Sequence, residues 1–473
     1  MDLARITAAN IDGRTQNARY RQSQFQRLQS ALVERIADIQ DAIRADSGHT
    51  QQEVRAEVIL AMQELRTHYA SCDIHKDLEI EYRIAKGQNN EDNVQGAGIV
   101  YIVPSTHTLF FSIISALTAA MAAGNCVVLE LPQTTMSLPV LLRQILPGAL
   151  DHDTFTITSQ RPDPSFMSKA LLVDQTDSDA PSGLISSATS RSVAIVDRSG
   201  DVTEAAHALV TARFALGGRS PYSPDAVLVN EFAMKPFVEA VIQHASKYLA
   251  GENGEARQSQ APTRRQSLLD SIQKDRSARI LVSGSNWGVV EVQDRKSPLL
   301  KRKIDEKVLV VHPVTSLDDA IDMNFNQTLA AVYAFAAPAS AKYLTQFIDA
   351  DISWVNHVPS NMLIGPAIPR NTPYSQTTRY AISHFQKPRP QLITPSTATF
   401  AVNSVLDTKS TVRSDALWRA ALSPLPPTKQ RAGFKIGFFE QGILTGVSIT
   451  LISLVATFST VGYYTWVYVR MRG

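Results

Sequence analysis

The sequence predicts an α/β protein of two domains followed by one transmembrane helix. Three observations support this class. Short apolar runs typical of buried strands alternate with helical segments between residues 96 and 360. The chain has 473 residues, which favours two domains over one. Residues 441–469 contain no charged side chain, and about 20 apolar residues are enough to cross a membrane.

The chain opens with two expected amphipathic helices and a β-α-β unit. Apolar residues recur at spacings of three and four from Phe25 to Ile43 and again from Val54 to Tyr69, which is a helical period. A strand is expected at residues 96–104, a helix at 109–124 and a second strand at 126–131. A strand, a helix and a strand in this order predict a right-handed unit with parallel strands.

Two further strands, "ALLVDQ" and "SVAIVD", complete a predicted nucleotide-binding-like α/β domain with Rossmann-type architecture over residues 1–198. A second α/β domain is expected over residues 199–384, with strands in "AVLVNEF", "RILVSGS", "VLVVHPV" and "AVYAFA". Residues 385–434 are rich in Pro, Ser and Thr and are expected to form a return segment and linker. Residues 435–473 are expected to form the membrane anchor.

Composition excludes several classes of function. The formal net charge is +2, so no bulk field points to nucleic acid as a partner. The two cysteines, Cys72 and Cys126, form neither a disulfide framework nor a metal-binding spacing, which suits a reducing compartment. The histidines show no spacing typical of zinc ligands, so no metal site is expected. The N-terminus has no apolar core of the kind found in signal peptides.

The uncharged stretch 441–469 is the strongest local signal in the sequence. Aromatic residues gather near its end, as they do at membrane interfaces, and Arg470 and Arg472 follow it. A buried core helix is the alternative, but such helices are rarely this long or this uniformly uncharged. Lys429, Arg431 and Lys435 precede the span and favour a cytosolic location for the large domain. We therefore expect a single-pass, tail-anchored membrane protein.

Several stretches together resemble the aldehyde dehydrogenase superfamily, and most of all its membrane-anchored fatty aldehyde branch (class 3). They are the helical opening from residue 13 and five later segments, "ALTAAMAAGNCVVLEL", "AIVDRSGDVTEAA", "SPDAVLVNEF", "VLVVHPVTSLDDAIDMNF" and "WVNHVP". The resemblance covers roughly residues 13–385 plus the anchor. It implies a cleft between two α/β domains, a nicotinamide cofactor, a dimer and an anchor in the endoplasmic reticulum membrane.

The family oxidises aldehydes with a cysteine nucleophile, an oxyanion-binding asparagine and a glutamate base. Counting back from "PD" at 224–225, the cysteine position falls on Pro221, which has neither a thiol nor a backbone N–H. The glutamate position falls on Ser187 and the asparagine position on Thr106. Ser220 and Ser223 neighbour Pro221, but they are expected to be ordinary loop residues because no base is visible beside them.

The cofactor positions are substituted as well. The lysine that meets the adenosine ribose in the family falls on Glu130. The turn that approaches the pyrophosphate falls on residues 173–179, around Gln175, which lack glycine and contain three aspartates, Asp174, Asp177 and Asp179. The glutamate and phenylalanine that hold the nicotinamide end fall on Lys303 and Asp305. No bound cofactor is therefore expected.

Three functions stay open at this point. The first is a pseudoenzyme that binds or scaffolds at a membrane, as a homodimer or as a heterodimer with an active relative. The second is active oxidation of lipophilic aldehydes with NAD or NADP through unrecognised residues. The third is a different reaction in the same pocket without a nicotinamide. Fold alone does not decide between them.

Overall fold

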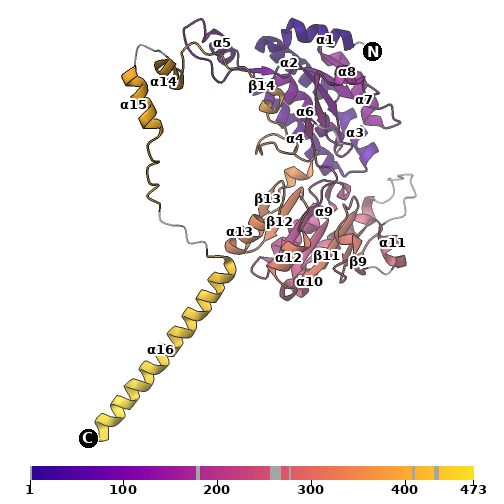
Figure 1. The fold of residues 1–473 in the computed structure, drawn as a ribbon. Coiled ribbons are helices and arrows are strands. Elements are labelled where there is room, and N and C mark those ends of the chain that lie inside the picture. The colour runs from indigo at the N-terminus through magenta and orange to yellow at the C-terminus, as the bar shows by residue number, and fades with distance from the viewer. Residues whose placement is uncertain are drawn as a thin grey trace. The chain divides into compact units, whose positions relative to one another are not determined.

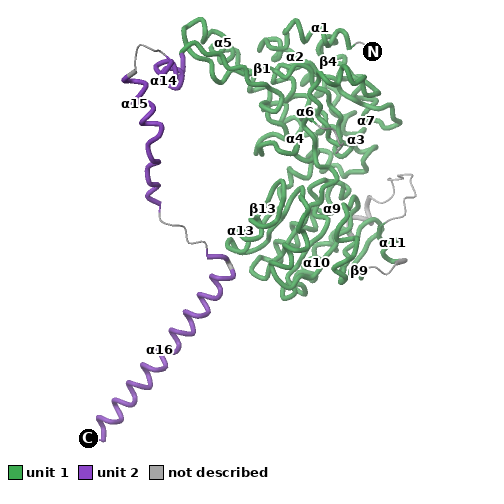
Figure 2. The backbone as a smooth tube through the Cα atoms, viewed as in Figure 1, with its two compact units in different colours: residues 1–394 green, residues 395–473 purple. Residues whose placement is uncertain are grey.

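The computed structural model of this chain describes residues 3–176, 182–255, 268–275, 278–406, 411–430 and 436–472. The chain divides into two compact units, residues 1–394 and residues 395–473, which Figure 2 colours green and purple. The first unit contains a five-stranded and a seven-stranded sheet, and the described part of the second is helical. The predicted α/β class with a C-terminal apolar helix is therefore confirmed.

The five-stranded sheet has the order β4-β3-β2-β5-β6, and all of its strands are parallel. Its central strands are buried along nearly their whole length, which explains why they are continuous apolar runs without alternation. The strands are β2 (Ile99–Val103), β3 (Cys126–Glu130), β4 (Phe155–Thr158), β5 (Ala170–Asp174) and β6 (Leu184–Ile185). The connecting helices are α6 (Leu109–Ala122), α7 (Ser137–Ala149) and α8 (Pro164–Met167).

Helix α6 confirms the expected helix between the first two strands of this sheet. Its residues from Phe110 to Ala122 are all buried, so it shows no amphipathic stripe. The helix ends two residues before Gly124, whose backbone has a φ of 82°. A side chain at Gly124 would also lie 3.1 Å from the carbonyl of Thr15, so both the turn and the close approach require glycine.

The N-terminal helices precede this sheet in the chain, and α1 to α4 lie beside it in Figure 1. They are α1 (Leu3–Asp12), α2 (Ala18–Glu34), α3 (Ile36–Ser47), α4 (Gln51–Ala70) and α5 (Ile74–Tyr82), with a short 3-10 turn, η1 (Arg14–Gln16). The apolar stripe expected from Phe25 to Ile43 is divided at Arg35 between α2 and α3. Helix α4 begins with a reciprocal cap between Thr50 and Glu53, and it packs against α6.

The seven-stranded sheet has the order β13-β12-β7-β8-β11-β10-β9, and only the β9–β10 pair is antiparallel. Its strands are β7 (Ser192–Val196), β8 (Ala226–Asn230), β9 (Arg279–Ser283), β10 (Trp287–Glu291), β11 (Lys307–Val314), β12 (Ala331–Phe335) and β13 (Ser353–Val355). Its helices are α9 (Val202–Phe214), α10 (Glu231–Glu255), α11 (Leu268–Asp275), α12 (Leu317–Met323) and α13 (Pro338–Phe347). Short 3-10 turns occur at η2 (Ala215–Gly218), η3 (Pro298–Leu300), η4 (Ser360–Leu363) and η5 (Ile382–Phe385).

Strand β7 corrects the domain boundary expected at residue 198. The sequence analysis assigns this strand to the first domain, whereas the structure pairs it with β8 and β12 in the second sheet. The chain therefore crosses between the sheets after β6, at residues 186–191. An apolar strand carries no mark of the sheet it joins, so composition alone could not place the crossing.

The segment expected to be a linker, residues 385–434, also differs from the expectation. Strand β14 (Gln386–Pro388) pairs with β1 (Val94–Gly96), and two helices follow, α14 (Thr397–Leu406) and α15 (Thr411–Ala421). The prolines that suggested a linker stop at Pro395 and resume at Pro424, which leaves a proline-free stretch long enough for both helices.

Helix α16 (Phe438–Arg472) contains the whole uncharged stretch. The span has 34 residues; its most apolar 18-residue window has a mean hydropathy of 1.8, and none of that window is buried. Length, composition and exposure therefore all fit a membrane span rather than a core helix.

Candidate functional site

The loop that follows β2 carries Thr106, the position assigned to the oxyanion donor. Thr106 itself is exposed, whereas its two successors contact a distant segment, residues 363–370. His107 Nε2 donates to the Leu363 carbonyl at 2.8 Å, and the Gly365 amide donates to Thr108 Oγ1 at 2.7 Å. Burial lowers the pKa of the His107 imidazole to about 4, so this side chain is neutral at pH 7 and serves as a hydrogen-bond donor.

The other two assigned loops reach the same segment. The Ile368 amide donates to the Tyr222 hydroxyl at 2.9 Å, next to the nucleophile position Pro221. Arg370 Nε donates to Ser187 Oγ, the base position, at 2.6 Å. The structure thus brings all three loops to residues 363–370, although among the described contacts none joins Thr106, Ser187 and Pro221 to one another directly.

A charged and a polar side chain donate hydrogen bonds to the loop around Pro221. The Pro221 carbonyl accepts hydrogen bonds from Lys303 Nζ at 2.6 Å and from Ser192 Oγ at 2.8 Å. Lys303 also lies 3.1 Å from Asp225, whose other oxygen pairs with Arg213 at 3.3 Å. Burial lowers the pKa of the Lys303 ammonium, and Asp225 opposes this shift. The residue assigned to a cofactor position therefore fastens the loop assigned to the nucleophile.

Ser220 and Ser223 are both completely buried and bond backbone atoms. Ser220 Oγ accepts from the Tyr222 amide at 3.2 Å, and Ser223 Oγ donates to the Ala212 carbonyl at 2.8 Å. Neither hydroxyl bonds a histidine or carboxylate in the part of the chain that the structure describes, so no group activates either serine as a nucleophile.

Glu130 and Gln175, two positions assigned to the cofactor, are engaged in contacts within the protein. Tyr101 donates to Glu130 Oε2 at 2.6 Å, and Arg161 lies 3.6 Å from the same oxygen. Gln175 is fully buried. It accepts from the Ser105 amide at 2.9 Å and donates to the Ser112 carbonyl in α6. Gln175 therefore connects β5 to the loop after β2 and to α6.

Two assigned aspartates, Asp177 and Asp179, lie outside the described residues. Asp174 is described, is fully buried, and accepts from the Thr176 amide at 2.8 Å. Asp305, assigned to the nicotinamide end, is exposed just before β11. Its side chain is free to contact solvent.

Arg379 is the central residue of the site that the sequence analysis missed. It is 6% exposed, and its guanidinium lies 5.8 Å from the Phe111 ring and 5.7 Å from the Tyr222 ring. It also donates to the carbonyls of Ile364 and Pro366. A buried cation thus fixes the segment that contacts the three loops. An arginine directly before the apolar residues Tyr380, Ala381 and Ile382 is the signal that could have revealed it.

A small cavity lies beside this segment. The cavity that Arg379, Phe111 and Ile368 border has a volume of about 20 Å³, room for one water molecule. Sites for small molecules and cofactors usually measure about 300–1,000 Å³. A larger groove of about 310 Å³ lies elsewhere, along β4, and is lined by Arg5, Arg143, Pro147, His152, Phe155, Thr156 and Ile157.

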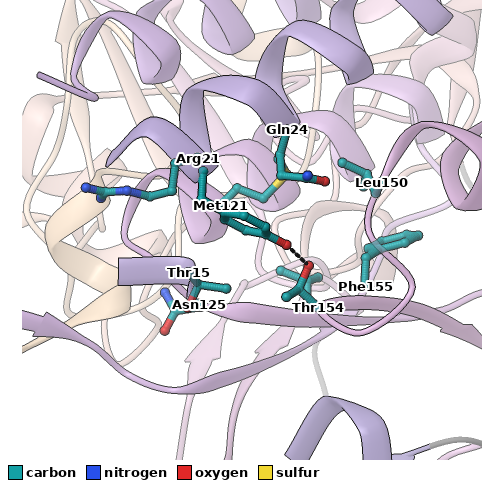
Figure 3. Close-up of a pocket in the computed structure, with 10 residues that line it drawn as sticks. Thr15, Arg21, Gln24, Met121, Asn125, Leu150, Thr154 and Phe155 are labelled. Carbon is teal, nitrogen blue, oxygen red and sulfur yellow. Dashed lines mark hydrogen bonds between the residues drawn. The ribbon is translucent and has the colours of Figure 1, made fainter. Parts of the chain in front are cut away.

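Figure 3 shows a second small cavity, between α2, α6 and the first sheet. Its volume is also about 20 Å³. The Tyr20 hydroxyl, which borders it, lies 2.8 Å from both Thr154 Oγ1 and Asp151 Oδ2. The size and the polar lining suit a buried water rather than a substrate.

Helix α4 holds the walls of the site with four polar side chains. Glu53 accepts from the Leu216 amide at 2.6 Å and Glu57 from the Phe111 amide at 3.2 Å. The other two contacts reach the C-terminal end of the site, where Glu64 accepts from the Arg379 amide at 2.6 Å and His68 Nε2 lies 3.1 Å from the Tyr380 carbonyl. One helix therefore fastens the α6 N-terminus, the turn before the Pro221 loop and the segment around Arg379.

Replacing Glu57 with glutamine is expected to stabilise the protein at high pH. Burial raises the pKa of Glu57 to about 7, although backbone amides oppose the shift. Since the folded pKa exceeds the usual 4.5, the stability due to the protonated form is full below pH 4.5 and is lost as pH rises through 7. Glu57→Gln should therefore raise the free energy of unfolding by about 1–3 kcal/mol at pH 8 and change it little at pH 4.5.

The control for this prediction is Glu53→Gln on the same helix. Burial opposes ionisation of Glu53, but the amides of Leu216 and Thr50 outweigh it and lower its pKa. This variant should lose stability at pH 8. Urea denaturation at both pH values, followed by pulse proteolysis, measures the two effects. Equal behaviour of the two variants would contradict the assignment of opposite charge states.

The chain is similar to known proteins in sequence and in fold. The model of the aldehyde dehydrogenase family matches residues 5–158. Aldehyde dehydrogenase family 3 member B1 of Rattus norvegicus is 25% identical over 71% of this chain and 77% of its own length. This chain is similar to the aldehyde dehydrogenase family. The recognition from sequence is therefore confirmed.

Other relatives show the same similarity. Family 3 member A2 of Macaca fascicularis is 23% identical over 71% of this chain and 75% of its own length. Among solved structures, the substrate-bound Staphylococcus aureus AldH superposes with a TM-score of 0.62 at 14% identity, covering 84% of this chain and 94% of that one. At this identity the structural likeness shows the fold alone.

Proposed function

We propose that this protein is a membrane-anchored pseudoenzyme of the aldehyde dehydrogenase superfamily that acts by binding or scaffolding. The observation that carries the proposal is the bond between Lys303 Nζ and the Pro221 carbonyl. Aldehyde oxidation in the family needs a thiolate in that loop and a cofactor close to it. Here proline supplies no thiol, and a lysine ammonium fastens the loop instead.

Two further observations support the same conclusion. Ser187 cannot act as a general base at neutral pH, and its hydroxyl already accepts from Arg370. The segment that Arg379 fixes contacts all three loops, and the cavity beside it has a volume of only about 20 Å³. The fold is retained without the groups that the family's reaction requires.

The anchor is helix α16, and we place it in the endoplasmic reticulum membrane with the large domain in the cytosol. Its length and hydropathy support insertion, and Arg470 and Arg472 stack on Trp466 and Tyr468 near its end. Such pairs of basic and aromatic side chains suit the boundary between headgroups and acyl chains. We infer two partners for the protein. One is the bilayer, and the other is a second subunit, either another copy or an active relative.

The competing function is NAD- or NADP-dependent oxidation of lipophilic aldehydes. It is favoured by the family 3 relatives, whose names describe aldehyde dehydrogenases. Calorimetric titration of NAD and of NADP into the full-length protein in detergent distinguishes the two. The proposed function predicts no saturable heat at millimolar cofactor, while an active family 3 enzyme titrated in parallel should bind. Saturable binding by this protein would contradict the pseudoenzyme.

A further inference from the structure

Helices α14 and α15 expose large apolar side chains just before the membrane span. Phe400 is 57% exposed, Trp418 is 67% exposed and Leu422 is 65% exposed. Others on the two helices and just beyond them are Val402, Val405, Leu406, Val412 and Leu425. Soluble proteins rarely leave apolar residues of this size together at the surface without a partner.

The charges on the same stretch are mainly positive. Arg413, Arg419 and Lys429 are basic, and Asp415 is the one acidic residue in the described range 411–430. Arginine stems can cover apolar surface while their heads reach a polar layer. Aromatic, aliphatic and basic side chains mixed in this way fit the boundary of a bilayer that contains anionic lipid.

The short connection between α15 and α16 keeps α15 within reach of the bilayer. Helix α15 ends at Ala421 and α16 begins at Phe438. The intervening residues can extend by at most about 3.3–3.6 Å each, so α15 stays within roughly 60 Å of the span. A tether of this length gives a high effective concentration at the membrane surface, so weak individual contacts suffice for docking.

We propose that α14 and α15 lie on the surface of the membrane that α16 crosses. Phe400, Trp418 and Leu422 enter the interface, and Arg413 and Arg419 contact anionic headgroups. The inference rests on the proposed anchor and adds a second, lipid-dependent contact to it. The docked helices would limit how far the linker lets the first unit move from the membrane.

Trp418 provides a direct test in the full-length protein. Trp287 and Trp354 are buried in the first unit, so Trp466→Phe leaves Trp418 as the one tryptophan of the second unit. This variant is reconstituted into vesicles of phosphatidylcholine with phosphatidylserine, in which the acyl chains are brominated near the headgroup. We expect the bromines to quench most of the emission from Trp418. The double variant Trp418→Phe, Trp466→Phe measures the emission of the buried Trp287 and Trp354, which the brominated lipids do not quench.

The control for charge is Arg413→Gln with Arg419→Gln. It should reduce quenching severalfold in vesicles that contain phosphatidylserine, down to the level in phosphatidylcholine alone. Flotation of the same vesicles separates the two proposals. A protein that does not float with the vesicles contradicts the anchor. A protein that floats without quenching of Trp418 overturns the surface docking and shows that protein, either the first unit or a second copy, covers α15.

Discussion

Purified full-length protein is expected to form NADH or NADPH from aldehydes at least about 10⁴-fold more slowly than an active family 3 enzyme. Pro221 provides no thiolate, so no covalent adduct forms with the aldehyde. Ser187 provides no base to activate water. The assay measures absorbance of the reduced cofactor with short-chain and long-chain aldehydes. Turnover at the rate of an active relative would refute the proposed function.

The informative variant is Pro221→Cys combined with Ser187→Glu, which should not restore turnover. The new cysteine would stand in a loop whose carbonyl is bonded to Lys303, and the new glutamate would face Arg370. Neither change removes Lys303 from the position assigned to the nicotinamide end. Turnover by the double variant alone would show that a cofactor site exists and that the assignments of Glu130, Gln175, Lys303 and Asp305 are wrong.

Replacing Asp225 with alanine is expected to lower the free energy of unfolding by about 3–5 kcal/mol. Asp225 is fully buried and pairs with Arg213, which is also fully buried. It also accepts from the Ser192 amide at 2.8 Å and from the Ile304 amide at 2.9 Å. Alanine would leave the Arg213 guanidinium without a counter-charge and both amides without an acceptor.

The matched control is Asp305→Ala, an exposed aspartate before β11, which pairs with the strand β8 that follows Asp225. It should change the free energy of unfolding by less than about 0.5 kcal/mol. Pulse proteolysis across a urea series measures both variants in detergent. A loss below about 1 kcal/mol for Asp225→Ala would show that water or a shifted side chain replaces the carboxylate.

The strands and the membrane helix were predictable because each depends on a local pattern. Buried strands such as β2 and β3 are continuous apolar runs, and the uncharged residues of α16 form one continuous stretch. The assignment of β7 to the second sheet depends instead on partners far along the chain. Helices α14 and α15 were hidden by prolines that lie beyond their ends.

The candidate site was predictable only as a set of substitutions. The sequence shows that Pro221 and Ser187 lack the expected chemistry, but not what takes its place. Lys303 meets Asp225 from 78 positions away, and the Arg379 amide meets Glu64 from 315 positions away. Contacts over such separations follow from the packing of whole elements, and one sequence holds no pattern that reports them.

The pairing of β1 with β14 has a consequence for how the protein is made. It joins Val94 to Pro388, so this clasp must wait until nearly the whole first unit has left the ribosome. At about 5–20 residues per second the wait is roughly 15–60 s. Helix α16 begins 50 residues after Pro388, so its apolar surface emerges about 2–10 s later. The order of the segments along the chain therefore allows β1 and β14 to pair before the aggregation-prone helix α16 is exposed. If this pairing were slow, the unpaired strands and α16 would be exposed at the same time.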